Sequence, residues 1–126
     1  MNDTTVSPLV LIVDDNAKNL KLARDVLLAA GFQTLEAASG TEGIALAAEH
    51  LPNVILMDLR LPDMDGTDAA RKLANGARTS AIPLVAFSSL ALEGDSAWLL
   101  ASGFAGCIGK PIDIREFPDQ VRRYCN

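Results

Sequence analysis

Five polar residues stand directly behind short apolar runs, and their chemical types suit a site that holds a metal ion and a phosphoryl group. They are three aspartates, a serine and a lysine: Asp14, Asp15, Asp58, Ser88 and Lys110. Clustered carboxylates repel one another in a partly dry crevice unless some are protonated or a divalent cation lies among them. Short oxygen ligands suit a hard ion such as Mg²⁺. With such an ion and a lysine present, a carboxylate can attack phosphorus.

The apolar runs predict five strands that alternate with helices. The run at 9–13 is continuous and rich in β-branched residues, as in a strand buried on both faces. Asn16 is the expected N-cap of the helix that follows, and Gly31 its end. The expected strands are 9–13, 32–37, 54–57, 82–87 and 106–109, and the expected helices are 17–30, 41–49, 67–75, 92–102 and a last one to Tyr124. That last helix opens with Asp113 and Glu116 spaced as a capping box, and Pro118 should kink it or delay its start.

Strict alternation of strands and helices predicts an α/β fold with a parallel sheet covered on both faces. Right-handed crossovers favour a flavodoxin-like, doubly wound (βα)5 arrangement with strand order 2-1-3-4-5. The carboxyl ends of parallel strands lie along one edge, and ligands bind where the strand order reverses. The five polar residues are therefore expected to meet at that edge, although they are scattered in the sequence.

Length and composition restrict the class of protein. A chain of 126 residues has room for one domain, expected over 1–126 with its core at about 8–124. The net charge of −5 and the scattered basic residues argue against nucleic-acid binding. No run approaches the roughly 20 apolar residues that cross a bilayer, and no signal peptide is evident, so a cytoplasmic location is expected. Cys107 and Cys125 lack metal-ligand spacing, and Cys107 is interpreted as a small buried hydrophobe.

Five strings at the expected strand ends resemble the receiver domain of two-component response regulators. They run in order over nearly the whole chain: LIVDDN at 11–16, ILMDL at 55–59, LPDMDG at 61–66, PLVAFS at 83–88 and IGKPI at 108–112. The resemblance implies a stand-alone signalling domain, which promotes only its own phosphoryl transfer and dephosphorylation. Its expected donor is a histidine kinase or a histidine phosphotransfer protein, and its output a downstream protein target.

The resemblance also assigns a role to each matching position. Asp58 would be the phospho-acceptor, and Asp15 the main Mg²⁺ ligand with Asp14 assisting. Asp58 and the backbone carbonyl of Arg60 would complete the metal site.

The remaining roles concern the phosphoryl group and the output. Lys110 would pair with the phosphoryl oxygens, and its bond to Pro111 resembles the cis peptide of the family. Ser88 would donate a hydrogen bond to the phosphoryl group and shift towards it, acting on the face of the fourth helix, fifth strand and fifth helix. Signalling would proceed as a monomer or as a phosphorylation-dependent dimer.

Two positions depart from the family pattern. Cys107 stands where the family usually has an aromatic residue that rotates as the hydroxyl residue moves, so the usual relay to the output face is in doubt. Trp98 stands where the family helix usually offers a polar, outward residue. It is interpreted either as an exposed anchor for a partner or as a side chain lying flat on a neighbouring helix.

Other functions fit the residues less well. A haloacid-dehalogenase-type phosphatase would need an aspartate where Arg60 stands, and a flavodoxin would need a hydroxyl- and glycine-rich loop after the first strand. A calcium loop would need acidic residues at Leu61 and Lys72. His50 is interpreted as a solvated helix end. The alternatives left open are a receiver-like scaffold that acts without phosphorylation and a receiver fragment of a hybrid histidine kinase.

Overall fold

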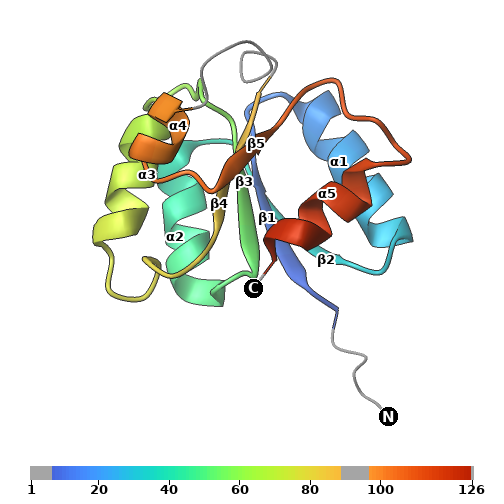
Figure 1. Cartoon of the computed structure of the whole chain (residues 1–126), viewed down its shortest axis with the longest axis horizontal. Coiled ribbons are helices and arrows are strands. Elements are labelled where there is room, and N and C mark those ends of the chain that lie inside the picture. Colours follow the sequence, from blue (N-terminus) through green and yellow to red (C-terminus); the bar gives the residue numbers. More distant parts are fainter. Residues whose placement is uncertain (1–6, 89–96, 126) are drawn as a thin grey trace.

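The computed structural model describes residues 7–88 and 97–125, with the side chains of Ala97 and Trp98 outside the described set. Five parallel strands form one sheet in the order β2-β1-β3-β4-β5, which confirms the expected flavodoxin-like order (Figure 1). The strands are β1 (Leu9–Val13), β2 (Gln33–Ala37), β3 (Val54–Met57), β4 (Leu84–Phe87) and β5 (Gly106–Ile108).

Helices cover both faces of this sheet. Figure 1 shows α1 and α5 on one face and α2, α3 and α4 on the other. The helices are α1 (Ala17–Ala29), α2 (Gly40–His50), α3 (Gly66–Asn75), α4 (Ala97–Ala101) and α5 (Phe117–Tyr124). None of the helices in the described part of the chain is long and apolar enough to span a bilayer.

The sheet separates two hydrophobic layers, because successive side chains of a strand point to opposite faces. On β1, Val10 and Ile12 pack with α1 and α5, whereas Leu11 and Val13 pack with the other three helices. Both layers are fully buried at these positions, so the strand is apolar throughout. The layer under α1 and α5 also holds the stacked rings of Phe87 and Phe117, whose centroids are 5.8 Å apart.

The helix ends follow local sequence signals. The side chain of Asn16 accepts hydrogen bonds from the amides of Lys18 and Asn19, which confirms it as the N-cap of α1. Gly31 and Gly103 follow α1 and α4 with φ of 95° and 101°, in the left-handed region where glycine is favoured.

The structure differs from the predicted boundaries mainly near prolines. β4 begins at Leu84 rather than at 82, since Pro83 has no N–H to donate to the ladder. α5 begins at Phe117 and not at Asp113, which is the delayed start expected from Pro118. Pro118 lies in the first turn of α5, where a missing N–H leaves no helical bond unmade. Asp113 instead caps the preceding turn through the amide of Arg115. Of the helix expected at 92–102, residues 92–96 lie outside the described residues, and the rest contains α4.

Candidate functional site

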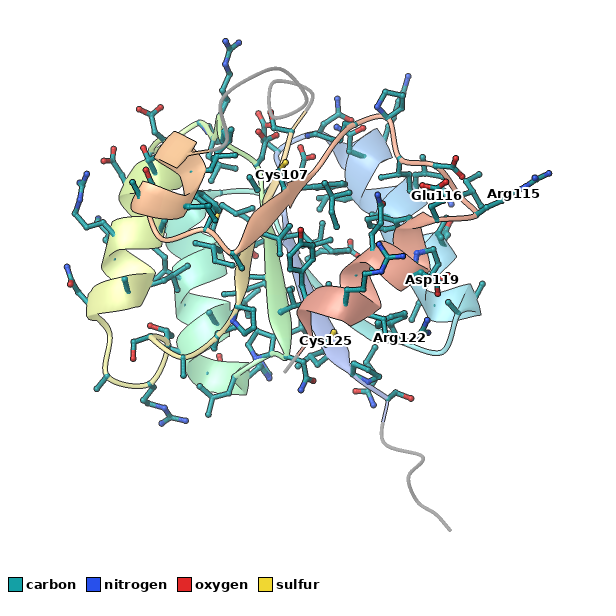
Figure 2. All side chains as sticks on the ribbon, in the orientation of Figure 1. Cys107, Arg115, Glu116, Asp119, Arg122 and Cys125 are labelled. Atoms are coloured by element: carbon teal, nitrogen blue, oxygen red, sulfur yellow. The ribbon has the colours of Figure 1, made fainter. Side chains whose placement is uncertain are left out.

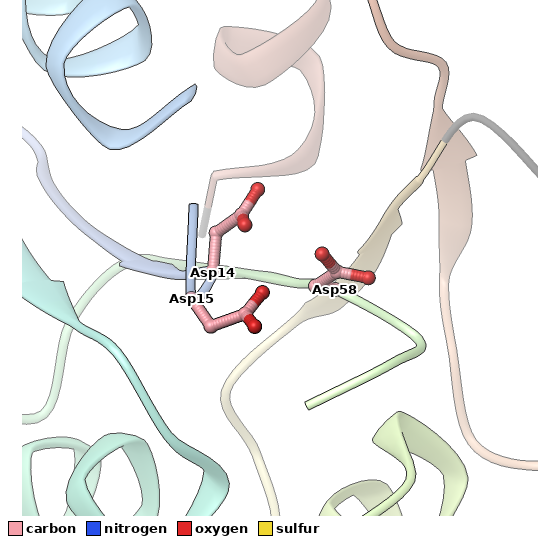
Figure 3. Close-up of side chains that lie close together, drawn as sticks. All are labelled: Asp14, Asp15 and Asp58. Atoms are coloured by element: carbon pink, nitrogen blue, oxygen red, sulfur yellow. The ribbon is translucent and has the colours of Figure 1, made fainter. Parts of the chain in front are cut away.

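Three carboxylates meet at the carboxyl edge of the sheet, at the point where the strand order reverses. Asp14 and Asp15 follow β1, and Asp58 follows β3 (Figure 3). Backbone bonds extend the ladder here, because the Asp14 amide donates to the Ala37 carbonyl at 3.0 Å and the Asp58 amide donates to the Val13 carbonyl at 2.9 Å. One oxygen from each carboxylate lies within 4.8 Å of the others. The structure therefore brings together the aspartates that were predicted to converge.

Lys110 reaches into this cluster from the end of β5. Its ammonium lies 2.7 Å from Asp14 Oδ2 and 3.0 Å from Asp58 Oδ2, and its side chain is 13% exposed. The same nitrogen lies 5.1 Å from the centre of the Phe87 ring. The Lys110–Pro111 peptide bond is cis, as expected. A single ammonium thus bridges a carboxylate from each of two strands.

Asp14 is completely buried, and both of its carboxylate oxygens are engaged. Oδ1 accepts a hydrogen bond from the Asn16 amide at 2.9 Å, and Oδ2 accepts one from Asn19 Nδ2 at 3.2 Å in addition to Lys110. Sequence reasoning did not identify Asn19 as a site residue. The sequence did hold a signal for Asn19, because it lies about one helical turn after the N-cap Asn16. A side chain at that position points back towards the end of the preceding strand.

Asp58 is 8% exposed, and the groups around it shift its pKa in opposite directions. Burial is the largest influence and raises the pKa of this carboxyl above its usual value. The Arg60 amide, which donates to Oδ1 at 2.9 Å, and the Lys110 ammonium lower the pKa, while the charge of Asp14 raises it. The net shift of the Asp58 pKa is upward, so the ionised form of Asp58 is disfavoured here and another cation would stabilise it.

A hollow of about 290 Å³ opens over these groups. Ser88, at the end of β4, is 4% exposed and contributes to its wall. The wall is formed by Asp14, Asp15, Asn16, Asn19, Asp58, Arg60, Ser88 and Lys110. Asp15 is exposed, and the cluster holds three carboxylates but one lysine ammonium. A hard divalent cation fits this all-oxygen donor set.

The loop after Asp58 folds back tightly on the backbone of Asp58 and Leu59. Gly66 donates from its amide to the Leu59 carbonyl at 2.9 Å, and Arg60 and Asp65 face each other in an isolated antiparallel bridge. A Cβ atom at Gly66 would lie 2.6 Å from the Asp58 carbonyl oxygen and 2.8 Å from Leu59 Cα. Only glycine fits here without a backbone shift, which explains the Asp-Gly pair at the start of α3.

The other residues singled out in the sequence lie away from the hollow or outside the described set. Cys107, on β5, is half-buried and packs against the layer that includes α4, whereas Cys125 follows α5. No disulfide joins these two cysteines, and Figure 2 shows them well separated. His50 ends α2 with a side chain 41% exposed, which confirms a solvated helix end. The side chain of Trp98 is outside the described set, so its role as an anchor stays a prediction.

Comparisons with known proteins agree with this geometry. The response regulator receiver domain matches residues 10–122. The polar-differentiation response regulator DivK of Brucella ovis is 36% identical over 115 residues, which cover 91% of this chain and 94% of that protein. Chemotaxis response regulator CheY4 of Vibrio cholerae shares the fold with a TM-score of 0.85 at 23% identity, covering 94% of this chain and 99% of CheY4.

A further structure is similar in fold and carries a metal. The receiver domain of sensor histidine kinase PA1611 from Pseudomonas aeruginosa PAO1 has a TM-score of 0.84 and 28% identity, covering 94% of this chain and 98% of that domain. It was crystallised with a magnesium ion coordinated in its active site cleft.

Proposed function

The chain belongs to the response regulator receiver family, and from this premise we propose that Asp58 accepts a phosphoryl group from a phosphohistidine. The donor is a histidine kinase or a histidine phosphotransfer protein. The observation that carries the proposal is the Lys110 ammonium, which lies 3.0 Å from one oxygen of a largely buried Asp58 at the floor of an open hollow. A nucleophile, a fixed cation and room for a phosphoryl group are all that this transfer needs from a protein.

In the proposed step, a carboxylate oxygen of Asp58 forms a bond to phosphorus while the bond from phosphorus to the donor nitrogen breaks. The electron pair of the broken bond stays on the imidazole nitrogen. The Arg60 amide, 2.9 Å from Oδ1, holds the orientation of the carboxylate during the attack. Lys110 pairs with the phosphoryl oxygens, and the Ser88 hydroxyl donates a hydrogen bond to one of them.

Mg²⁺ is the proposed cofactor, held by Asp15, Asp14, Asp58 and the Arg60 carbonyl. When bound, the ion neutralises the carboxylates and the charge that develops on the transferred group. Asp15 is the exposed member of the cluster, which supports its role as the main direct ligand. Asp14 has donors on both oxygens, which supports a role through water.

The signal passes to the α4-β5-α5 face and from there to a downstream protein. Ser88 is tied to that face, because its amide donates to the Ile108 carbonyl of β5 at 3.3 Å. Cys107, which precedes Ile108 on β5, replaces the aromatic residue of the usual relay. We therefore propose that a shift of β5 itself links Ser88 to the output face.

The domain, over 1–126, is cytoplasmic and catalyses no reaction other than its own phosphorylation and dephosphorylation.

Intact mass after incubation with acetyl phosphate tests the acceptor function. The wild type in Mg²⁺ should gain the mass of one phosphoryl group, and EDTA should abolish the gain because the carboxylate cluster then lacks its counter-ion. Asp58→Asn is the matched control, and it should gain nothing. A wild type that stays unmodified with both acetyl phosphate and a phosphorylated histidine phosphotransfer protein would favour the scaffold alternative.

An apolar strip beside the hollow offers a docking surface for the donor protein. A small hollow adjoins the site, and its apolar lining residues are Leu22, Phe87, Pro111 and Ile112. A larger hollow of about 380 Å³ lies between α1 and the segment that contains Ile114 and Pro118. Ile114 lies at the rim of the larger hollow and is 61% exposed. A buried carboxylate in such a contact weakens association, so Ile114→Glu should slow transfer from a protein donor about tenfold.

The same variant should react normally with acetyl phosphate, because this small donor needs no docking surface. The rate of phosphoryl transfer with each donor is the measurement. Leu51→Glu is the control, since Leu51 is also an exposed aliphatic residue but lies after α2, near the opposite edge of the sheet. Equal slowing with both donors would place the defect in the site and reject the docking surface.

A further inference from the structure

Asp63 lies in the loop between Asp58 and α3, yet its carboxylate binds the start of a different helix. Oδ1 accepts a hydrogen bond from the Gly40 amide at 2.8 Å, and Oδ2 accepts from the Thr41 amide at 2.9 Å and from the Thr41 hydroxyl at 2.6 Å. Both amides belong to the first turn of α2, whose N–H groups have no partner within the helix. Asp63 therefore ties the β3–α3 loop to α2.

This tie is permanent at neutral pH. The bonds from the Thr41 hydroxyl and amide, followed by that from the Gly40 amide, lower the pKa of Asp63 to about 2. The carboxylate thus stays charged under all ordinary conditions, at a helix start that favours negative charge. Ser39 caps the same helix separately, by accepting a hydrogen bond from the Glu42 amide at 3.1 Å. Ser39 therefore caps one amide of α2 locally, whereas Asp63 caps two others from a different loop.

The residue next to Asp63 packs in the same contact. A Cβ atom at Gly40 would lie 2.6 Å from the sulfur of Met64, so the loop rests directly on the backbone of α2. At the other side of the loop, the Leu59–Gly66 hydrogen bond and the Arg60–Asp65 bridge close it. Arg60 lies inside this closed loop and lines the hollow. Its backbone position is therefore set by contacts at both sides of the loop.

We propose that Asp63 is a positioning residue for the metal site, because its bonds to α2 hold the loop that presents the Arg60 carbonyl. This inference rests on the proposed function, in which that carbonyl is a metal ligand. Asp63 itself does not line the hollow over the carboxylate cluster. Groups that orient a ligand typically change metal affinity by about 10–100-fold when they are removed. One neutral ligand among several is affected here, so Asp63→Ala should weaken Mg²⁺ binding about three- to tenfold.

The test is the dissociation constant of Mg²⁺ for the unphosphorylated protein, measured by titration calorimetry. Asp63→Ala and Thr41→Val should both raise it, and the double variant should raise it no further than Asp63→Ala alone, since both act through one contact. Ser39→Ala is the matched control, because it weakens the cap of α2 without touching the loop. It should lower the unfolding temperature and leave the Mg²⁺ constant unchanged.

Three outcomes overturn the inference: unchanged Mg²⁺ binding in folded Asp63→Ala and Thr41→Val, additive effects of the two substitutions, or equal weakening in Ser39→Ala. Thr41→Val keeps the Asp63 bonds to both amides, so it provides a folded test if Asp63→Ala does not fold. Failure of the proposed function is recognised separately, with Asp15→Asn. If the wild type binds Mg²⁺ no better than Asp15→Asn, the metal site itself is wrong, whatever Asp63 does.

Discussion

Asp58→Asn should accept no phosphoryl group and should also unfold at a higher denaturant concentration than the wild type at pH 7. Burial and the charge of Asp14 both disfavour an ionised Asp58, and the amide of asparagine removes that charge while keeping the side-chain shape. Lys110 keeps its bond of 2.7 Å to Asp14 in the variant. Neutral replacements of buried charges are often stabilising, and about 1–2 kcal/mol is expected here without Mg²⁺.

The pH dependence of this gain has a definite sign. A carboxyl with a raised pKa binds its proton more tightly in the folded state, so the folded wild type loses stability as the pH rises from the unfolded value through the folded one. The advantage of Asp58→Asn should therefore vanish below about pH 3.9, the ordinary carboxyl pKa, and should grow as the pH rises above it.

Urea unfolding in EDTA at several pH values is the measurement. Asp68→Asn is the control, since Asp68 is an exposed carboxylate that pairs with Arg71 within α3. A variant less stable than the wild type at pH 7 would mean that attraction between Asp58 and Lys110 outweighs burial, and would contradict the prediction.

Lys110→Met should be the most destabilising single change in the site. The methionine keeps an unbranched apolar chain near Phe87, but it removes the ammonium that lies within 3.0 Å of both Asp14 and Asp58. Two largely buried carboxylates are then left facing each other without a cation. Removing one partner of a buried ion pair costs about 3–5 kcal/mol, and the partial exposure of Lys110 reduces the expected loss to about 2–4 kcal/mol.

Magnesium should restore much of this loss, since a divalent cation among the carboxylates replaces the missing charge. Urea unfolding with and without Mg²⁺ should therefore show a larger gain from the metal in Lys110→Met than in the wild type. Lys21→Met is the control, because Lys21 forms an exposed pair with Asp25. If Lys110→Met proves as stable as the wild type in EDTA, the carboxylates are not both charged in the folded protein.

Local patterns in the sequence were sufficient for the sheet and for most of the site. Apolar runs that end in Asp14, Asp58 and Ser88 identify buried parallel strands, and a single topological rule then brings their ends together. The start of α5 was harder to predict from the sequence, because Asp113 carries a capping signal but caps the turn before the helix. The Asp63 contact was not predictable, since its partners Gly40 and Thr41 are more than 20 residues away and no periodic pattern connects them.

The partition of the core into two layers has a consequence for how such a protein can change during evolution. Neighbouring residues of one strand, such as Leu56 and Met57, belong to different layers and have different neighbours. Substitutions that reshape the α1–α5 side can accumulate without repacking the α2–α3–α4 side. The surface proposed for the donor protein lies on the first side, and the anchored loop after Asp58 lies on the second. A change of upstream partner can therefore leave the anchoring of that loop intact.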